Sequence, residues 1–109
     1  GHPTTTRDFL YIDDAARAMV ALLDAPEPPA LVNVASGEER AMSDVVVSIT
    51  RASGFTGRVR WDDSMPVGIP RRAVDTARLD SLAADAPIGF DEGIQRTVAW
   101  YRANRDTTR

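Results

Sequence analysis

The chain has 109 residues, which is the length of one small domain, and 43% of them are hydrophobic. Its 13 basic and 16 acidic residues give a net charge of −3, which argues against a general nucleic-acid binder, because such proteins carry a basic excess. No apolar run approaches the roughly 20 residues of a membrane span. We therefore expect a cytoplasmic protein with neither a nucleic-acid nor a membrane partner. The absence of cysteine excludes disulfides, thiol catalysis and cysteine-rich zinc sites.

The first segment predicts a strand followed by a helix. Residues 7–12 (RDFLYI) carry the large apolar and aromatic side chains typical of a short strand. The helix expected over residues 15–23 begins with Asp13 and Asp14, whose carboxylates can accept the unpaired amide protons of its first turn. Its spacing places four apolar residues on one face: Ala15, Met19, Leu22 and Leu23.

The next segment predicts a second strand and a second helix. Residues 31–35 (LVNVA) have the composition of a strand. Ser43 is expected to cap a helix over residues 44–53, and Gly54 to end it. The β-branched run inside this helix makes a strand an alternative on local propensity, but the caps and the length favour a helix.

The rest of the chain predicts one strand and two helices. Residues 57–61 (GRVRW) alternate polar and apolar side chains, which is typical of a strand. A short helix over residues 76–82 is expected to be capped by Asp75, and a last helix to cover residues 91–103 before residues 107–109 fray.

This order of elements indicates one small mixed α/β domain of about three short strands and four helices, spanning residues 1–109. Residues 1–3 are expected to be a tag remnant or a flexible start.

Residues 7–18 (RDFLYIDDAARA) resemble a block in the C-terminal portion of the extended short-chain dehydrogenases/reductases, the NAD(P)-dependent epimerases, dehydratases and reductases of nucleotide sugars. The resemblance continues in order through residues 32–37 (VNVASG) and 91–104, and it covers about residues 4–104. It implies the substrate-binding C-terminal lobe of such an enzyme, without the Rossmann domain.

Within that superfamily the sequence is most similar to the GDP-L-fucose synthases, which are NADP-dependent 3,5-epimerase/4-reductases of a GDP-4-keto-6-deoxy sugar. Residues 54–59 (GFTGRV), 61–72 (WDDSMPVGIPRR) and 75–79 (DTARL) carry this similarity. The family usually has Ser-Lys-Pro-Asp-Gly where residues 64–68 are Ser-Met-Pro-Val-Gly, so two polar groups near the substrate are replaced and the sugar and base stay open.

The superfamily's redox chemistry needs a Tyr-x-x-x-Lys pair, which this sequence lacks. The chain has no lysine, and Tyr11 and Tyr101 are followed four residues later by alanine and arginine. The pair of glycines at Gly54 and Gly57 has no third glycine at residue 60, and it follows a predicted helix instead of preceding one. We therefore assign no catalytic, cofactor-binding or metal-binding residue to this chain, and the resemblance implies NADP only for the complete enzyme.

Arginines are the candidate substrate ligands. The planar guanidinium forms two-pronged, charge-assisted hydrogen bonds with phosphate oxygens. The resemblance implies that Arg58, Arg7 and Arg72 line the nucleotide-sugar site, in this order of preference, and Arg71 is the fourth candidate. On pattern alone, a solvated strand explains Arg58 about as well, and a surface loop explains Arg71 and Arg72 better.

Two functions follow from these observations, and they leave open whether this chain acts within an enzyme. The first is a nucleotide-sugar-binding lobe, with GDP-sugars preferred, that needs a Rossmann domain in cis or in trans for turnover. The alternative is a non-catalytic, stand-alone domain used for dimerisation or assembly, because a small sheet leaves open edges.

Overall fold

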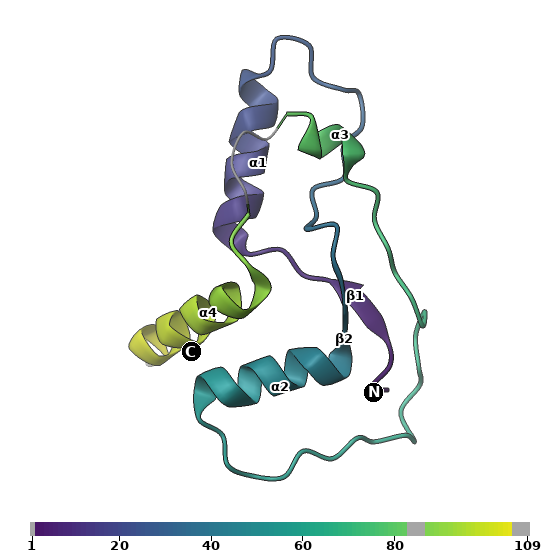
Figure 1. Ribbon diagram of the computed structural model, residues 1–109, viewed down its shortest axis with the longest axis vertical. Helices are drawn as coiled ribbons and strands as arrows, with labels where there is room; N and C mark the ends of the chain where they lie inside the picture. The colour runs from purple at the N-terminus through teal and green to yellow at the C-terminus, as the bar shows by residue number, and fades with distance from the viewer. Residues whose placement is uncertain (1, 83–86, 106–109) are drawn as a thin grey trace.

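The structure is a computed structural model that describes residues 2–82 and 87–105 (Figure 1). Within these residues two strands and four helices form the small mixed α/β arrangement that the sequence predicted. In chain order the elements are β1 (Thr6–Asp8), α1 (Ile12–Asp24), β2 (Glu39–Ala41), α2 (Met42–Ser53), α3 (Ala77–Asp80) and α4 (Phe90–Asn104). Gly1 and the end expected to fray at residues 107–109 lie outside the described residues.

Strand β1 has a neighbour on each side. It pairs antiparallel with β2, with Arg7 opposite Arg40 in the register. On its other side the Thr6 N–H donates to the Pro70 carbonyl over 2.9 Å, and Thr6 forms a parallel bridge with Arg71. Three stretches that are far apart in the sequence therefore meet at one short strand.

The pairing corrects the predicted strands. Residues 31–35 and 57–61 form no ladder, so two of the three predicted strands are wrong. Strand β2 was not predicted, because its sequence Glu-Arg-Ala lacks apolar alternation and only its contact with β1 makes it a strand. The strand predicted over residues 7–12 pairs only at its start, since the chain enters α1 at Ile12.

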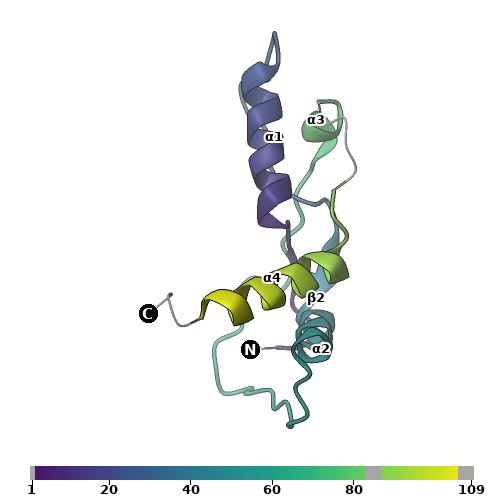
Figure 2. The same cartoon turned by 90° about the vertical axis from the view of Figure 1, so that its left-hand side faces the viewer.

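Helix α2 follows β2 without a loop and packs against α4 (Figure 2). Gly54 ends α2 with a left-handed φ of 64°, as predicted. The predicted cap at Ser43 is wrong, because the residue preceding the helix is Ala41 and no side chain caps it. Instead, the Ser43 N–H donates to the Pro3 carbonyl over 3.0 Å, so backbone from the start of the chain satisfies this helix end.

The acidic start of α1 has a tertiary role and not the predicted capping role. No side chain caps α1, and Asp14 is only 6% exposed. Its Oδ2 accepts the Ile88 N–H over 2.8 Å, and its Oδ1 pairs with Arg17. A buried carboxylate must be paired or hydrogen-bonded, and these two contacts fix α1 to the segment that leads into α4.

The last two helices agree with the sequence. The Asp75 Oδ1 accepts the Ala77 N–H over 3.0 Å, but the residue that precedes α3 is Thr76 and not the predicted Asp75, and α3 is shorter than expected. Helix α4 extends the predicted range by one residue at each end.

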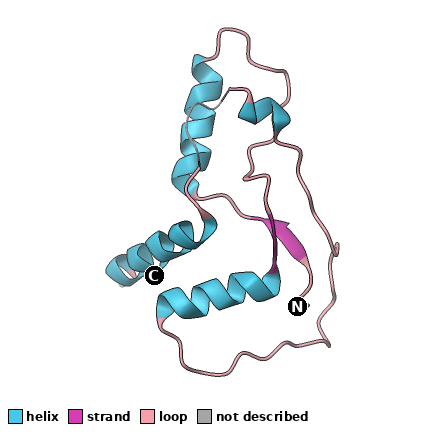
Figure 3. Ribbon diagram, viewed as in Figure 1, coloured by secondary structure: helices cyan, strands magenta, loops and turns pink. Residues whose placement is uncertain are grey.

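The buried core is sparse. Among the described residues, only Ala18, Val45 and Leu79 are buried apolar side chains. The accessible surface of 8275 Å² exceeds the roughly 5,900 Å² expected for a compact monomer of this mass. The radius of gyration of 16.4 Å likewise exceeds the expected value of about 13 Å. Long stretches of loop connect the elements (Figure 3), and the chain leaves much apolar surface uncovered.

Candidate functional site

The middle of β1 presents Arg7 with its positive charge unpaired. Its Nη1 donates to the backbone carbonyls of Thr6 and Ile69, over 2.6 and 2.8 Å. Both acceptors are neutral, and within residues 2–82 and 87–105 Arg7 forms no ion pair. A Cβ on Gly68 would lie 3.8 Å from the Arg7 Nη2, so Gly68 lies beside this end of the guanidinium. The Nε and Nη2 groups form no hydrogen bond with the described residues, which leaves both donors of a fixed cation for an anion.

Arg71 lies beside β1, but its guanidinium is already paired. Its Nε donates to the Glu39 Oε2 over 3.0 Å, its Nη2 contacts the other carboxylate oxygen, and Thr6 Oγ1 donates to Oε2 over 2.9 Å. The hydrogen bonds from Arg71 first, and then from Thr6, lower the pKa of Glu39 below its ordinary value of 4.5. The two-pronged pair fixes residues 70–72 against β2 and makes Arg71 a weaker anion ligand than Arg7.

Arg72 and Arg58 are exposed, and within the described part of the chain neither forms a hydrogen bond or ion pair. The Thr6–Arg71 bridge brings Arg72 to the same strand as Arg7. Arg58 belongs to the segment that passes below α2 before rising along β1 (Figure 1), and no contact joins it to the other three arginines. The structure thus gathers Arg7, Arg71 and Arg72 at β1 and leaves Arg58 on a separate stretch.

The turn beside this cluster is held by Asp8. Its two carboxylate oxygens accept the N–H groups of Ser36 and Gly37, each over 2.8 Å. Gly37 has a φ of 76°, and a Cβ there would lie 2.9 Å from Thr76 Oγ1. Residue 37 is therefore best as glycine for two reasons: its φ is left-handed, and Thr76, the residue that precedes α3, lies too close for a Cβ.

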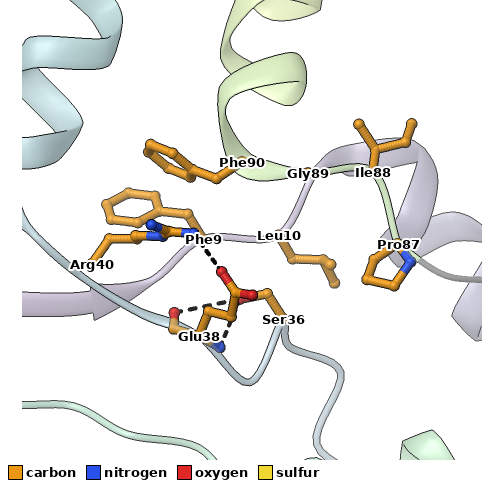
Figure 4. A pocket seen from close by; sticks show the side chains of 9 residues that line it. All are labelled: Phe9, Leu10, Ser36, Glu38, Arg40, Pro87, Ile88, Gly89 and Phe90. Carbon is orange, nitrogen blue, oxygen red and sulfur yellow. Dashed lines mark hydrogen bonds and ion pairs between the residues drawn. The ribbon is translucent and has the colours of Figure 1, made fainter.

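A hollow lies on the other side of the turn, between the end of β1 and the start of α4 (Figure 4). Arg40 stacks on the Phe90 ring with its guanidinium 5.3 Å from the centroid, and it pairs with Glu38 over 2.5 Å. Phe9 meets Phe90 edge-on at 5.9 Å. The Arg40 Nε is buried without a hydrogen-bond partner among the described residues.

Arg40 lines this hollow but was not among the residues that the sequence predicted for a site. It stands among acidic residues in a strand that the sequence did not signal, and only the register opposite Arg7 brings it to the site.

Across the described ranges, no three His, Cys, Asp or Glu side chains gather as a metal site would require. No helix in the same part of the chain is long and apolar enough to cross a membrane.

Comparison with known proteins identifies relatives of this chain. The sequence profile of the NAD dependent epimerase/dehydratase family matches residues 1–35. GDP-L-fucose synthase 1 of Arabidopsis thaliana is 34% identical over 95% of this chain and 32% of its own length. GDP-L-fucose synthase of Escherichia coli is 30% identical over 100% of this chain and 37% of its own length. The chain therefore spans about a third of the length of these curated relatives.

Solved structures show the same relationship. A GDP-L-fucose synthetase from Naegleria fowleri bound to NADP is 28% identical over 100% of this chain and 35% of its own, with a TM-score of 0.87. The NAD-dependent NDP-hexosamine 5,6-dehydratase TunA, involved in tunicamycin biosynthesis, is 31% identical over 94% of this chain and 34% of its own, with a TM-score of 0.78.

Proposed function

This chain is homologous to part of the NAD dependent epimerase/dehydratase family, in particular to its GDP-L-fucose synthases, and from this we propose that it is a nucleotide-sugar-binding lobe of an NAD(P)-dependent epimerase/reductase. GDP-sugars are the preferred ligands, and the lobe needs a Rossmann domain in cis or in trans for turnover. A cytoplasmic location belongs to the same proposal. The observation that carries it is Arg7, a cation fixed by two carbonyls whose other donors form no hydrogen bond with the described residues.

The arginines around β1 suit a diphosphate for different reasons. Arg7 offers a prepositioned cation, because its carbonyl contacts fix the guanidinium without neutralising it. Arg71 acts indirectly, since its pairing with Glu39 holds the stretch that carries Arg72. Arg58 would complete the site from the segment after α2. Its side chain is long and exposed, so in the proposal it extends to a phosphate of the bound nucleotide.

NADP does not fit the residues of this chain. Gly54 and Gly57 lie at the C-terminal end of α2, where the backbone carbonyls and the negative end of the helix dipole repel phosphate. The chain also offers no Tyr-x-x-x-Lys pair. We therefore assign no hydride or proton-transfer step to this chain, and NADP belongs to the complementary Rossmann domain in the proposal.

The test is GDP binding by isothermal titration in the presence of a Rossmann half from a GDP-L-fucose synthase. We expect Arg7→Met, Arg58→Met and Arg72→Met each to weaken GDP binding about tenfold, because each removes a charge-assisted contact with a phosphate. Arg60→Met is the matched control, since Arg60 is an exposed arginine two residues from Arg58 and is expected to leave the affinity unchanged. Failure of GDP, UDP and their sugars to bind at all would refute the proposal.

The alternative, a non-catalytic domain used for dimerisation or assembly, is favoured by one observation. The accessible surface exceeds that of a compact monomer by about 2,300 Å², which is more than one partner contributes to a standard interface. Light scattering at high concentration tests it, and a monodisperse monomer would exclude self-assembly.

A further inference from the structure

Two arginines face each other across the strand pair. Arg7 and Arg40 are opposite in the antiparallel register, and opposite residues of such a pair present their side chains on the same face of the sheet. Their neighbours Thr6, Asp8 and Glu39 lie on the other face, where hydrogen bonds within the chain already engage them. Like charges directly opposite each other destabilise a strand pair, so the face with the two arginines favours a bound anion.

The only ion-pair partner of Arg40 among the described residues is an exposed carboxylate. The Arg40 Nη2 donates to the Glu38 Oε2 over 2.5 Å, and the two side chains are 40% and 66% exposed. An ion pair between exposed side chains contributes little to stability, because water already solvates both charges. Another anion can therefore replace Glu38 without disrupting the fold. The Phe90 ring, with its centroid 5.3 Å from the guanidinium, supports Arg40 when the carboxylate leaves.

The hollow beside Arg40 has room for an anion (Figure 4). Its volume is about 100 Å³, well above the roughly 10–15 Å³ that one water molecule needs. The Cβ atoms of opposite residues in a strand pair are about 4.5–5.5 Å apart, so the long side chains of Arg7 and Arg40 can reach one ligand. A ligand with two linked anionic groups suits this arrangement better than a ligand with a single anionic group.

We propose that Arg40 is a second ligand of the diphosphate assigned to Arg7, and that the Glu38 carboxylate occupies Arg40 until the diphosphate replaces it. This inference rests on the proposed function and adds to it one binding residue and the internal anion that competes with the ligand. Binding exchanges one charge-assisted hydrogen bond of Arg40 for another, so Arg40 raises the affinity by the difference between the two. Glu38 correspondingly lowers the affinity for a diphosphate.

A matched ion pair on α4 provides the control. Arg96 pairs with Glu92 over 2.5 Å, the two side chains are 47% and 56% exposed, and the Arg96 guanidinium lies 5.9 Å from the centroid of the Tyr11 ring. This pair repeats the chemistry of the Arg40 pair, but Arg96 lies on a helix and has no second arginine opposite it in a strand register. Substitutions in the two pairs change the net charge equally, and we expect only those at the strand pair to change diphosphate binding.

Isothermal titration of this chain with pyrophosphate tests the inference. We expect Arg40→Met to weaken pyrophosphate binding about tenfold, because it removes a charge-assisted contact and keeps an apolar side chain of similar length. Glu38→Gln should strengthen binding about two- to fivefold, since it removes the competing carboxylate. Arg96→Met and Glu92→Gln should leave the affinity unchanged. An unchanged affinity in either of the first two variants, or an equal change in its matched variant, would overturn the proposal.

A comparison of GDP with GMP separates a ligand from a structural residue. In a mixture with the Rossmann half saturated with NADP, Arg40→Met should weaken GDP binding about tenfold. It should weaken GMP binding by less than about twofold, because Arg7 suffices for a single phosphate. An equal loss for the two nucleotides would mean that Arg40 acts only through the fold, and it would overturn the proposal.

The two ligands separate this inference from the proposed function. GDP binding that responds to neither Arg40→Met nor Glu38→Gln rejects only the inference. Pyrophosphate binding that responds to both substitutions, in a chain that does not bind GDP, rejects only the function, and absence of binding for both ligands rejects both. The Glu38 side chain makes only an exposed ion pair, so Glu38→Gln decides the question if Arg40→Met does not fold.

Discussion

The surroundings of β1 and the segment from residue 55 to residue 69 are both irregular in sequence, but they are held very differently. At β1, Asp8 and Glu39 accept hydrogen bonds from residues that lie 28 to 33 positions away in the sequence. In the other segment, Asp62 accepts the N–H and the hydroxyl of Ser64, only two residues away. The carboxylates at β1 therefore join stretches that are far apart in the sequence, whereas the hydrogen bonds between Asp62 and Ser64 stay within one turn.

Removal of the Asp8 carboxylate should have the largest effect. Asp8→Ala leaves the N–H groups of Ser36 and Gly37 without their acceptor and should lower the free energy of unfolding by about 3 kcal/mol, because each bond to a charged group contributes 1.5 kcal/mol or more. Urea titration measures the change. Ser64→Ala is the control, because it removes a hydroxyl that donates only to Asp62, two residues away, and it should change stability by less than about 0.5 kcal/mol. Equal effects of the two substitutions would contradict the contrast between the two regions.

Substitution of three glycines separates backbone strain from crowding. Gly37→Ala should cost about 2 kcal/mol, since it meets both a left-handed φ of 76° and Thr76 Oγ1. Gly54→Ala should cost about 1 kcal/mol, because its φ is also left-handed but no atom lies within 4 Å.

Gly89→Ala serves as the control for both, since its φ is −60° and its surroundings are open. Thermal unfolding of the three variants gives the comparison. If Gly37→Ala were no worse than Gly54→Ala, the close approach of Thr76 would not limit residue 37.

The smallest expected effect is on the titration of Glu39. Its pKa is lowered in the folded chain, so its ion pair favours folding above the ordinary value of 4.5, and this contribution is lost as pH falls through the lowered pKa. Arg71→Met should raise the pKa of Glu39 toward the ordinary value, because it removes the largest cause of the shift. NMR titration of the side-chain carboxyl groups measures both effects.

The matched variant is Ser64→Ala. The hydrogen bonds from Ser64 lower the pKa of Asp62, so this variant should raise the pKa of Asp62 and leave Glu39 unchanged. If either variant raised the pKa of both Glu39 and Asp62, the two carboxylates would not report on separate regions of the molecule.

The candidate site was only partly predictable. The sequence indicated the four arginines, and the structure places Arg7, Arg71 and Arg72 at one strand. It could not indicate that Arg71 is paired with Glu39, or that Arg40 stacks on Phe90, because both contacts depend on strand β2. The register of two short strands is a tertiary property that no local pattern in these residues encodes.

The sequence by itself determined where the helices lie, since side-chain spacing within a few turns indicates α2 and α4 and Gly54 ends α2. It also carried the likeness to the GDP-L-fucose synthases. Only the tertiary structure decided the strands, because a strand exists through its partner. Residues 39–41 pair with β1 and become a strand, whereas residues 31–35, with far better strand composition, have no strand partner in the described part of this chain.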